Sequence, residues 1–240
     1  MNHIDINCDL GEGMANDHLV MPYITSCNIS CGAHAGNPEI ITQTLLEAKK
    51  CGVKIGAHPS YPDRENFGRI VMRMDRAALE DTLVAQLLSF KELATQQDLP
   101  LHHIKPHGAL YNQAAIHVET AEVILSIMKN QFPDLLLYAP YPSVIATLAA
   151  DTGIRVWYEA FADRNYNDDL TLVPRSQPMA LMHKVNDILS HISLMVEKKQ
   201  VKTLTGKIID FKVDTICLHG DNPNAVVIAK SISNKLSEMT

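Results

Sequence analysis

Short apolar runs alternate with segments of helical periodicity along the chain. The apolar runs are rich in aliphatic residues and short, which is typical of strands buried in a sheet. They predict strands over residues 3–8, 26–30, 53–57, 102–105, 135–139, 154–160 and 215–218. The segments between them have apolar positions three and four apart, which predicts helices over residues 39–50, 76–96, 118–131, 143–151, 179–199 and 225–236.

Glycines and prolines stand where helix ends need them. Gly52 and Gly153 follow two predicted helices, at positions that favour a left-handed backbone. Pro38 and Pro142 are expected in the first turn of a helix, and residues 222–224 (Asn-Pro-Asn) offer capping side chains before the last one. One long connection, residues 59–75, has no predicted element, and such loops are often functional.

The regular alternation of strand and helix predicts an α/β fold with a parallel sheet. Polar or charged residues follow each predicted strand, and parallel strands bring their carboxyl ends to one face. An open, doubly wound sheet is the alternative, but this gathering of polar strand ends favours a closed, TIM-like barrel of about seven strands with its active site on that face. No linker interrupts the pattern, so we expect residues 1–240 to form a single domain.

Carboxylates and histidines at these strand ends are the candidate catalytic groups. Asp9 and Glu12 follow the first strand, and His34, His58 and His107 follow three others. Such a set can supply acid and base groups near neutral pH. It can also hold a divalent metal, for which Asp9, His34 and His107 are the candidate ligands, and the sequence leaves both options open.

Further polar residues near the strand ends predict a pocket for a small charged substrate. Lys105 is a further candidate catalytic group, because its ammonium suits an oxyanion or a phosphate, and Arg69, in a loop that could act as a lid, suits a carboxylate. The candidate substrate-binding residues are Asp63, Arg69, Tyr111, Asn112, Glu159, Asp163, Arg164, Arg175, His219 and Asp221.

Composition and charge exclude several classes of protein. The net charge of −6 is spread over mixed charges without a basic stripe, which disfavours a nucleic-acid partner. No apolar run reaches the ~18 residues of a membrane span, and the first residues lack a basic, then apolar leader, so we expect a cytoplasmic protein. The five cysteines are expected to be reduced thiols. P-loop, dinucleotide-binding and serine-hydrolase motifs are absent.

Several motifs in one order resemble the LamB/YcsF family. They are Asn-Cys-Asp-Leu-Gly-Glu-Gly at 7–13, Asn-Ile-Ser-Cys-Gly-Ala-His-Ala-Gly at 28–36, Gly-Ala-His-Pro-Ser-Tyr-Pro-Asp at 56–63, Asn-Phe-Gly-Arg at 66–69, Lys-Pro-His-Gly-Ala-Leu-Tyr-Asn at 105–112, Glu-Ala-Phe-Ala-Asp-Arg at 159–164, Leu-Val-Pro-Arg-Ser-Gln at 172–177 and Cys-Leu-His-Gly-Asp at 217–221. The resemblance implies a distorted seven-stranded β/α barrel, similar to the glycoside hydrolase/deacetylase barrels.

The resemblance also implies a reaction. Members of this family are described as the A subunit of the prokaryotic 5-oxoprolinase, which acts with subunits B and C. The implied reaction is ATP-dependent hydrolytic ring opening of 5-oxo-L-proline to L-glutamate, with ADP and phosphate as the other products. ATP is thus the implied cosubstrate, bound on this chain or shared with the partners. A divalent metal remains an option.

Two rival functions stay open on the residues alone. One is a metal-dependent deacetylase or amidohydrolase that needs no ATP, and the other is a non-catalytic subunit that binds the lactam. The chain also departs from the family pattern, because Leu170 and Met179 stand where glycine is usual. A positive φ at those positions is costly for both residues, so we expect the nearby loops, which carry Arg175, to differ.

Overall fold

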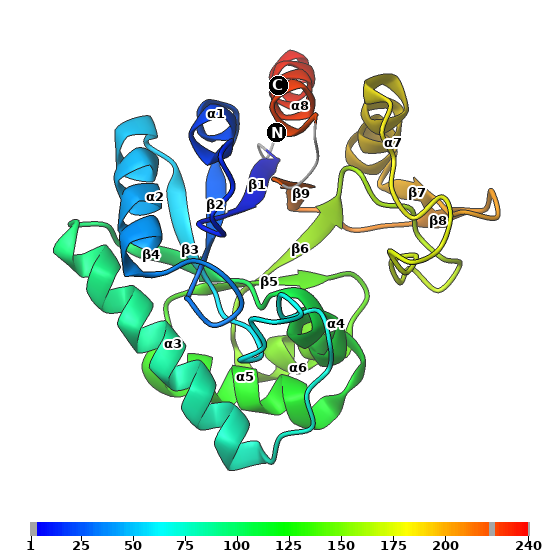
Figure 1. Cartoon of the computed structure of the whole chain (residues 1–240). Helices are drawn as coiled ribbons and strands as arrows, with labels where there is room; N and C mark the ends of the chain where they lie inside the picture. The colour runs from blue at the N-terminus through cyan, green and yellow to red at the C-terminus, as the bar shows by residue number, and fades with distance from the viewer. Residues whose placement is uncertain (1–3, 221–223, 240) are drawn as a thin grey trace.

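Parallel strands close into a barrel in the computed structural model, which describes residues 4–220 and 224–239. The seven barrel strands of this described part are β1 (Asp5–Leu10), β2 (Ser26–Ser30), β3 (Lys54–His58), β4 (Leu101–Ile104), β5 (Leu136–Pro140), β6 (Val156–Phe161) and β9 (Thr215–His219). β9 pairs with both β1 and β6, which closes the sheet on itself (Figure 1). The prediction of a closed barrel is therefore confirmed, and the open sheet is wrong.

Helices surround the barrel (Figure 1). They are α1 (Asp17–Val20), α2 (Pro38–Cys51), α3 (Arg76–Gln96), α4 (Gly108–Ile116), α5 (Val118–Gln131), α6 (Val144–Thr152), α7 (Val185–Lys198) and α8 (Ala225–Glu238), with a short 3-10 helix at Met21–Tyr23. An antiparallel hairpin of β7 (Gln200–Lys202) and β8 (Ile208–Asp210) precedes the last strand. None of the described helices is both long and apolar enough to cross a bilayer.

Most predicted helix ends agree with the structure to within two residues. Gly52 and Gly153 have left-handed φ values of 68° and 77°, and Pro38 is in the first turn of α2, as predicted. Pro142 is not in a helix, because Ser143 after it is the N-cap of α6. Asn224 is the N-cap residue of α8, whereas 222 and 223 lie outside the described residues.

The start of the fifth predicted helix is wrong. Residues 179–184 precede α7 and are not helical. This stretch runs beside residues 163–165 instead, and Met182 donates its backbone N–H to the carbonyl of Asp163. Helix α4 and the β7–β8 hairpin were not predicted, since α4 opens on a glycine and the hairpin strands have only three residues each.

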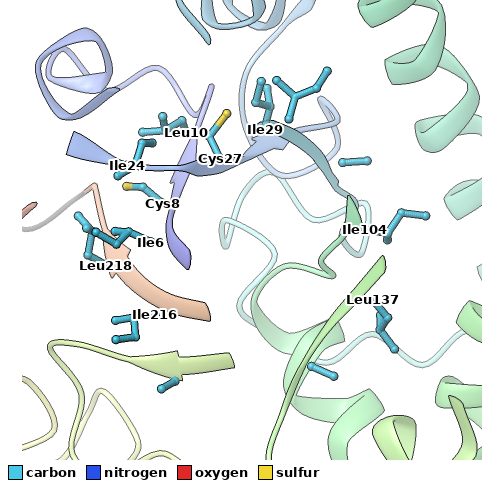
Figure 2. Close-up of a cluster of buried hydrophobic side chains, with 14 of the residues drawn as sticks. Ile6, Cys8, Leu10, Ile24, Cys27, Ile29, Ile104, Leu137, Ile216 and Leu218 are labelled. Carbon is cyan, nitrogen blue, oxygen red and sulfur yellow. The ribbon is translucent and has the colours of Figure 1, made fainter. Parts of the chain in front are cut away.

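Alternation along the strands separates a polar barrel interior from an apolar outer layer. In β1, Ile6, Cys8 and Leu10 are almost completely buried among the apolar side chains packed beneath the helices, as Figure 2 shows. Asp5 and Asn7, which alternate with these residues, make polar contacts across the barrel. Successive side chains of a strand point to opposite faces, so one strand serves both layers.

The barrel interior below the strand ends is filled by hydrogen-bonded polar groups. The carboxylate of Asp5 accepts from the hydroxyls of Thr25, Ser26 and Thr215 at 2.6, 2.7 and 2.6 Å. One layer higher, the imidazole of His103 occupies the space in front of Gly56, where a Cβ atom would lie 2.0 Å from its Nε2. Satisfied polar groups can be buried at little cost, and they fix the interior on which the site rests.

We expect His191 of α7 to make the fold sensitive to acid. Burial lowers its pKa from 6.5 to about 4. Between these pH values the unfolded chain binds more protons than the folded one, so stability falls as the pH falls, by at most about 3 kcal/mol from this group. His191→Leu should reduce the loss of unfolding free energy between pH 7 and pH 4, measured by urea denaturation.

The matched control is His183→Leu, because His183 precedes α7 and is exposed. This variant should lose as much unfolding free energy on acidification as the wild type. If His191→Leu did the same, the buried imidazole would not be a source of the acid sensitivity.

Candidate active site

A cavity of about 500 Å³ opens at the carboxyl ends of the strands. This volume is in the range of small-molecule sites. Most of the residues predicted from the sequence line it, namely Asp9, Glu12, His58, Arg69, Lys105, His107, Tyr111, Asn112, Glu159, Arg164, Arg175 and His219. The structure thus confirms that the polar ends of the strands lie together on one face of the barrel.

Three predicted residues do not line the cavity, and a fourth is not among the described residues. His34 is buried behind the histidines that do. Asp63 holds its own loop, accepting from the backbone N–H of Asn66 at 3.1 Å. Asp163 is buried 2.8 Å from Nδ1 of His219 and orients that ring. Asp221 lies outside the described residues.

Lys105 binds two carboxylates at the floor of the cavity. Its Nζ lies 2.8 Å from Oδ1 of Asp9 and 2.9 Å from Oε1 of Glu159, and the lysine is almost completely buried. Burial alone would raise the pKa of Asp9, but the ammonium of Lys105 outweighs it and holds this pKa well below the usual value. Asp9 is therefore ionised, and Lys105 is already neutralised by protein groups rather than available as an isolated cation.

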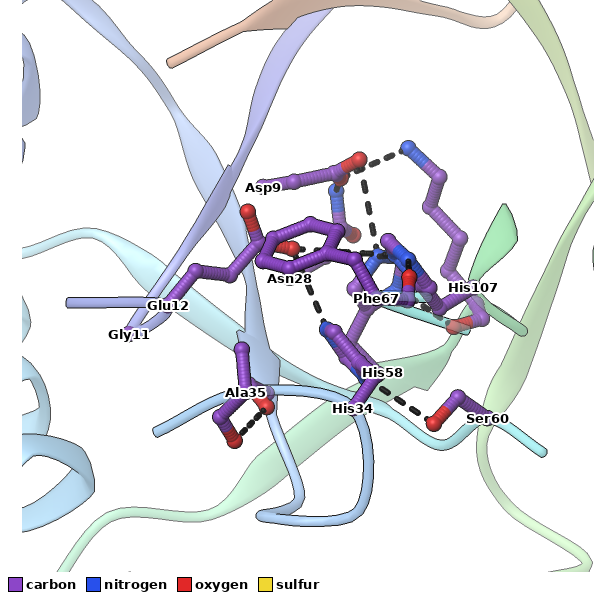
Figure 3. A network of polar contacts seen from close by, with 12 residues as sticks. Asp9, Gly11, Glu12, Asn28, His34, Ala35, His58, Ser60, Phe67 and His107 are labelled. Atoms are coloured by element: carbon purple, nitrogen blue, oxygen red, sulfur yellow. Dashed lines mark hydrogen bonds and ion pairs between the residues drawn. The ribbon is translucent and has the colours of Figure 1, made fainter. Parts of the chain in front are cut away.

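Three imidazoles and a carboxylate form a second group, which we call the histidine cluster: Glu12, His34, His58 and His107 (Figure 3). The rings of His34 and His107 are stacked with their centroids 3.7 Å apart. Oε1 of Glu12 lies 3.1 Å from Nε2 of His34 and 3.6 Å from Nδ1 of His107. Burial lowers the pKa of His34 to about 3 and that of His107 well below its usual value.

The cluster differs from the metal ligands predicted from the sequence. That prediction combined Asp9 with His34 and His107, whereas Glu12 and His58 are the groups that meet these histidines. Asp9 lies beside the cluster, with Oδ2 3.5 Å from Nε2 of His58. The cause is Lys105, whose ammonium holds the Asp9 carboxylate on the other side.

The long loop of residues 59–75 covers the histidine cluster from outside. Its Phe67 has a left-handed φ of 56° and accepts a hydrogen bond at its carbonyl from Nε2 of His107 at 2.9 Å. The next carbonyl, of Gly68, accepts from the N–H of Ala109 at 2.9 Å, in the first turn of α4. The loop is thus tied to α4 and places Arg69 at the cavity wall.

Three guanidinium groups, from Arg69, Arg164 and Arg175, line the same cavity. Burial and then the charge of Arg175 lower the pKa of Arg164. Nε of Arg164 is buried without a hydrogen-bond partner among the described residues, while its Nη2 donates to the carbonyl of Val173 at 2.7 Å. A guanidinium with spare donors beside a second positive charge favours an anionic ligand.

The loops next to Arg175 keep the backbone that glycine favours. Leu170 and Met179 both have a φ of 66°. The two side chains are therefore held in a conformation that costs roughly 1–2 kcal/mol for a residue with a Cβ. The expectation that these loops differ in backbone because glycine is absent is not met at either position.

Sequence reasoning missed residues that position the predicted ones. Asn28 donates to Oδ1 of Asp9 at 2.8 Å, Ser60 contacts Nδ1 of His34 at 2.9 Å, and Sγ of Cys217 lies 3.2 Å from Nζ of Lys105. Asn28 and Cys217 carried a signal, because each stands two positions from another polar residue on its strand and so faces the interior. Ser60 carried none, since it lies in the loop after β3.

Comparison with known proteins identifies the family. The LamB/YcsF family matches residues 4–240. The chain belongs to this family. Among family relatives, the 5-oxoprolinase A subunit of Neisseria meningitidis is 42% identical over 98% of this chain and 96% of its own length. The protein of the same name from Pyrococcus horikoshii is 39% identical over 98% of this chain and 94% of its own length.

A solved structure of the family agrees with the fold. The lactam utilization protein of Thermus thermophilus superimposes with a TM-score of 0.92 at 33% identity, over 98% of this chain and 96% of that one. The closed barrel described above is therefore shared with this solved structure. The relatives span nearly the same length, so the named subunit corresponds to this whole barrel.

Proposed function

We propose that this chain is the A subunit of a 5-oxoprolinase, which opens the ring of 5-oxo-L-proline to L-glutamate with cleavage of ATP to ADP and phosphate. The names of the family relatives support it, because they are 5-oxoprolinase subunits at about two fifths identity over almost the whole chain. The single structural observation that carries the proposal is a cavity with an ionised carboxylate on its floor and guanidinium groups in its wall.

The floor of the cavity suits the activation of water. Asp9 lies with Oδ2 3.5 Å from Nε2 of His58, and both residues line the cavity. A water bound beside the Asp9 carboxylate can give a proton to it as the water attacks the lactam carbon. Lys105 keeps the Asp9 carboxylate ionised and in place, so that this carboxylate can accept the proton of the water.

The wall of the cavity suits an anionic substrate. 5-Oxoproline carries one carboxylate next to its ring, and a guanidinium binds a carboxylate through two parallel hydrogen bonds. Arg69 and Arg164 are the proposed partners of this carboxylate, with Arg175 beside them. The remaining guanidinium charge would favour a phosphoryl group on the substrate.

ATP gives the reaction its driving force. A lactam carbonyl is a poor electrophile, and transfer of the γ-phosphoryl group to the lactam oxygen makes its carbon more reactive. One water then opens the C–N bond to leave an acyl phosphate, and a second water releases phosphate and glutamate. The sequence has no P-loop motif, so we place the nucleotide at or near the proposed partner subunits B and C, in the cytoplasm where ATP is available.

The test is glutamate formation from 5-oxo-L-proline by the purified chain, alone and mixed with subunits B and C, each with and without ATP. Turnover only in the mixture with ATP, with one ADP formed per glutamate, is the expected result. Turnover by the chain alone without ATP would overturn the proposal in favour of an amidohydrolase. Binding of 5-oxoproline without turnover in any mixture would favour a non-catalytic, lactam-binding subunit.

A further inference from the structure

Hydrogen bonds from outside the histidine cluster fix where two of its protons are. Nδ1 of His58 lies 2.7 Å from the carbonyl of Lys105, and Nε2 of His107 lies 2.9 Å from the carbonyl of Phe67. A carbonyl oxygen only accepts hydrogen bonds, so both of these ring nitrogens must be the donors. In a neutral imidazole the other nitrogen then carries a lone pair.

The proton of His34 is fixed in the same way through a serine. Nδ1 of His34 lies 2.9 Å from Oγ of Ser60, and that hydroxyl donates its one hydrogen to the carbonyl of Tyr61 at 2.8 Å. Ser60 can therefore only accept from His34, and Nδ1 must be the donor. All three histidines thus turn a nitrogen without a hydrogen toward the centre of the cluster.

These inward atoms face one another with no hydrogen between them. Nε2 of His58 and Nδ1 of His107 are 2.9 Å apart. Nε2 of His34 is 3.1 Å from a carboxylate oxygen of Glu12, which likewise only accepts. Lone pairs at such distances repel, so the arrangement needs a positive species among them. The four ligand atoms all lie within 4.8 Å of one another.

We propose that a divalent transition-metal ion, with Zn²⁺ the best fit, binds between Glu12, His34, His58 and His107. Three imidazole nitrogens and one carboxylate oxygen are a donor set that suits zinc. Metal–ligand bonds of about 2.0–2.2 Å in a tetrahedron separate the ligand atoms by roughly 3.3 Å. The separations of 2.9, 3.1 and 3.6 Å in the cluster lie on both sides of that value. The stacked rings of His34 and His107 must tilt on binding, so that both lone pairs point at the ion.

The surroundings of the cluster have the features of a metal site. Each histidine donates its outer N–H to an oxygen, which is the arrangement that orients metal-binding imidazoles. The ligands stand at or just after the ends of β1, β2, β3 and β4, so that four neighbouring strands contribute one group each (Figure 3). Glu12, His58 and His107 also line the cavity, which places the ion at its floor.

The experiment measures metal binding and does not depend on the proposed lactam reaction. The full-length chain, stripped with a chelator and dialysed, is titrated with Zn²⁺ in competition with a chromophoric chelator at neutral pH. We expect one ion per chain. Co²⁺ in place of Zn²⁺ should give the visible absorption of a nitrogen- and oxygen-ligated ion, which reports the ligands directly.

Variants inside and outside the histidine cluster show whether the Zn²⁺ ion binds there. Glu12→Gln keeps the shape of the side chain and removes its charge, and Ser60→Ala removes only the outer partner of His34, so each should weaken Zn²⁺ binding at least 10-fold. The matched control is His102→Gln, because Nδ1 of His102 also faces another imidazole, at 3.1 Å from His103, but in a different part of the barrel. It should bind one ion as tightly as the wild type.

Two results would overturn the proposal. One is the absence of Zn²⁺ and Co²⁺ binding by the wild-type chain, which would mean that a shared proton is the positive species in the cluster. The other is equal affinity in the wild type, Glu12→Gln and Ser60→Ala. Thermal unfolding of each metal-free variant shows whether it is folded, and the Co²⁺ spectrum of the wild type decides the ligands even if a variant is not.

Discussion

Asp9→Asn should lower ATP-dependent glutamate formation by the reconstituted enzyme about 10²- to 10⁴-fold, the range for loss of a general base. The substitution keeps the shape of the side chain, and its amide oxygen can still accept from Lys105 and Asn28, as Oδ1 does now. The amide NH₂ then takes the place of Oδ2, which faces His58 at 3.5 Å. A negatively charged proton acceptor is thus replaced by a neutral donor at the cavity floor.

Asp5→Asn is the matched control for Asp9→Asn. Asp5 lies earlier on β1, faces the same interior and accepts hydrogen bonds from four hydroxyls, but it does not line the cavity. Its conversion to an amide should lower the unfolding free energy and leave turnover per folded enzyme unchanged. If Asp9→Asn were as active as Asp5→Asn, Asp9 would have no part in the chemistry.

The pattern of strands made it possible to predict the barrel and most of the residues that line the cavity. Each strand is a short apolar run, and the residue types at its carboxyl end are chemically conspicuous, so Asp9, His58 and His107 could be placed on one face before their distances were known. The number of strands and their parallel order left an open sheet as the alternative, and the polar strand ends favoured the closure that β9 makes. These features depend on local sequence and on rules that hold for all parallel sheets.

The partners of these residues could not be predicted, because they depend on distances across the barrel. Lys105 and Glu159 are 54 positions apart in the sequence and meet only because β4 and β6 lie on either side of β5 in the sheet. Likewise, Glu12 rather than Asp9 lies among the three histidines, because Asp9 forms an ion pair with Lys105. The residue types indicated which side chains could belong to the site, but the tertiary structure determines which of them are in contact.

Lys105→Met should lower the unfolding free energy at pH 7 by about 3–5 kcal/mol, the usual cost of removing one partner from a buried ion pair. Lys105 is 2% exposed and lies 2.8 and 2.9 Å from the carboxylates of Asp9 and Glu159. Methionine fills a similar volume, so the expected loss comes from the missing charge. Two carboxylates would remain buried near each other without a counter-ion, and denaturation with urea measures the difference.

Acid should narrow the difference between Lys105→Met and the wild type. In the wild type the low pKa of Asp9 makes its carboxylate a stabilising group above the unfolded pKa of about 4, and this contribution is lost as the pH falls. In the variant the ammonium is gone, so the Asp9 carboxyl binds a proton more readily and its repulsion of Glu159 disappears on acidification. The two stability curves should therefore converge as the pH falls through 4 and below it.

Two further variants make the result specific for buried charge. Lys105→Met combined with Glu159→Gln leaves one buried carboxylate instead of two, so it should recover part of the lost stability. Lys49→Met removes a lysine whose Nζ lies 3.4 Å from Asp98 with both side chains largely exposed, at 47% and 90%. That pair should contribute at most about 1 kcal/mol. If Lys105→Met cost no more than Lys49→Met, the ammonium would not be what holds the two carboxylates at the cavity floor.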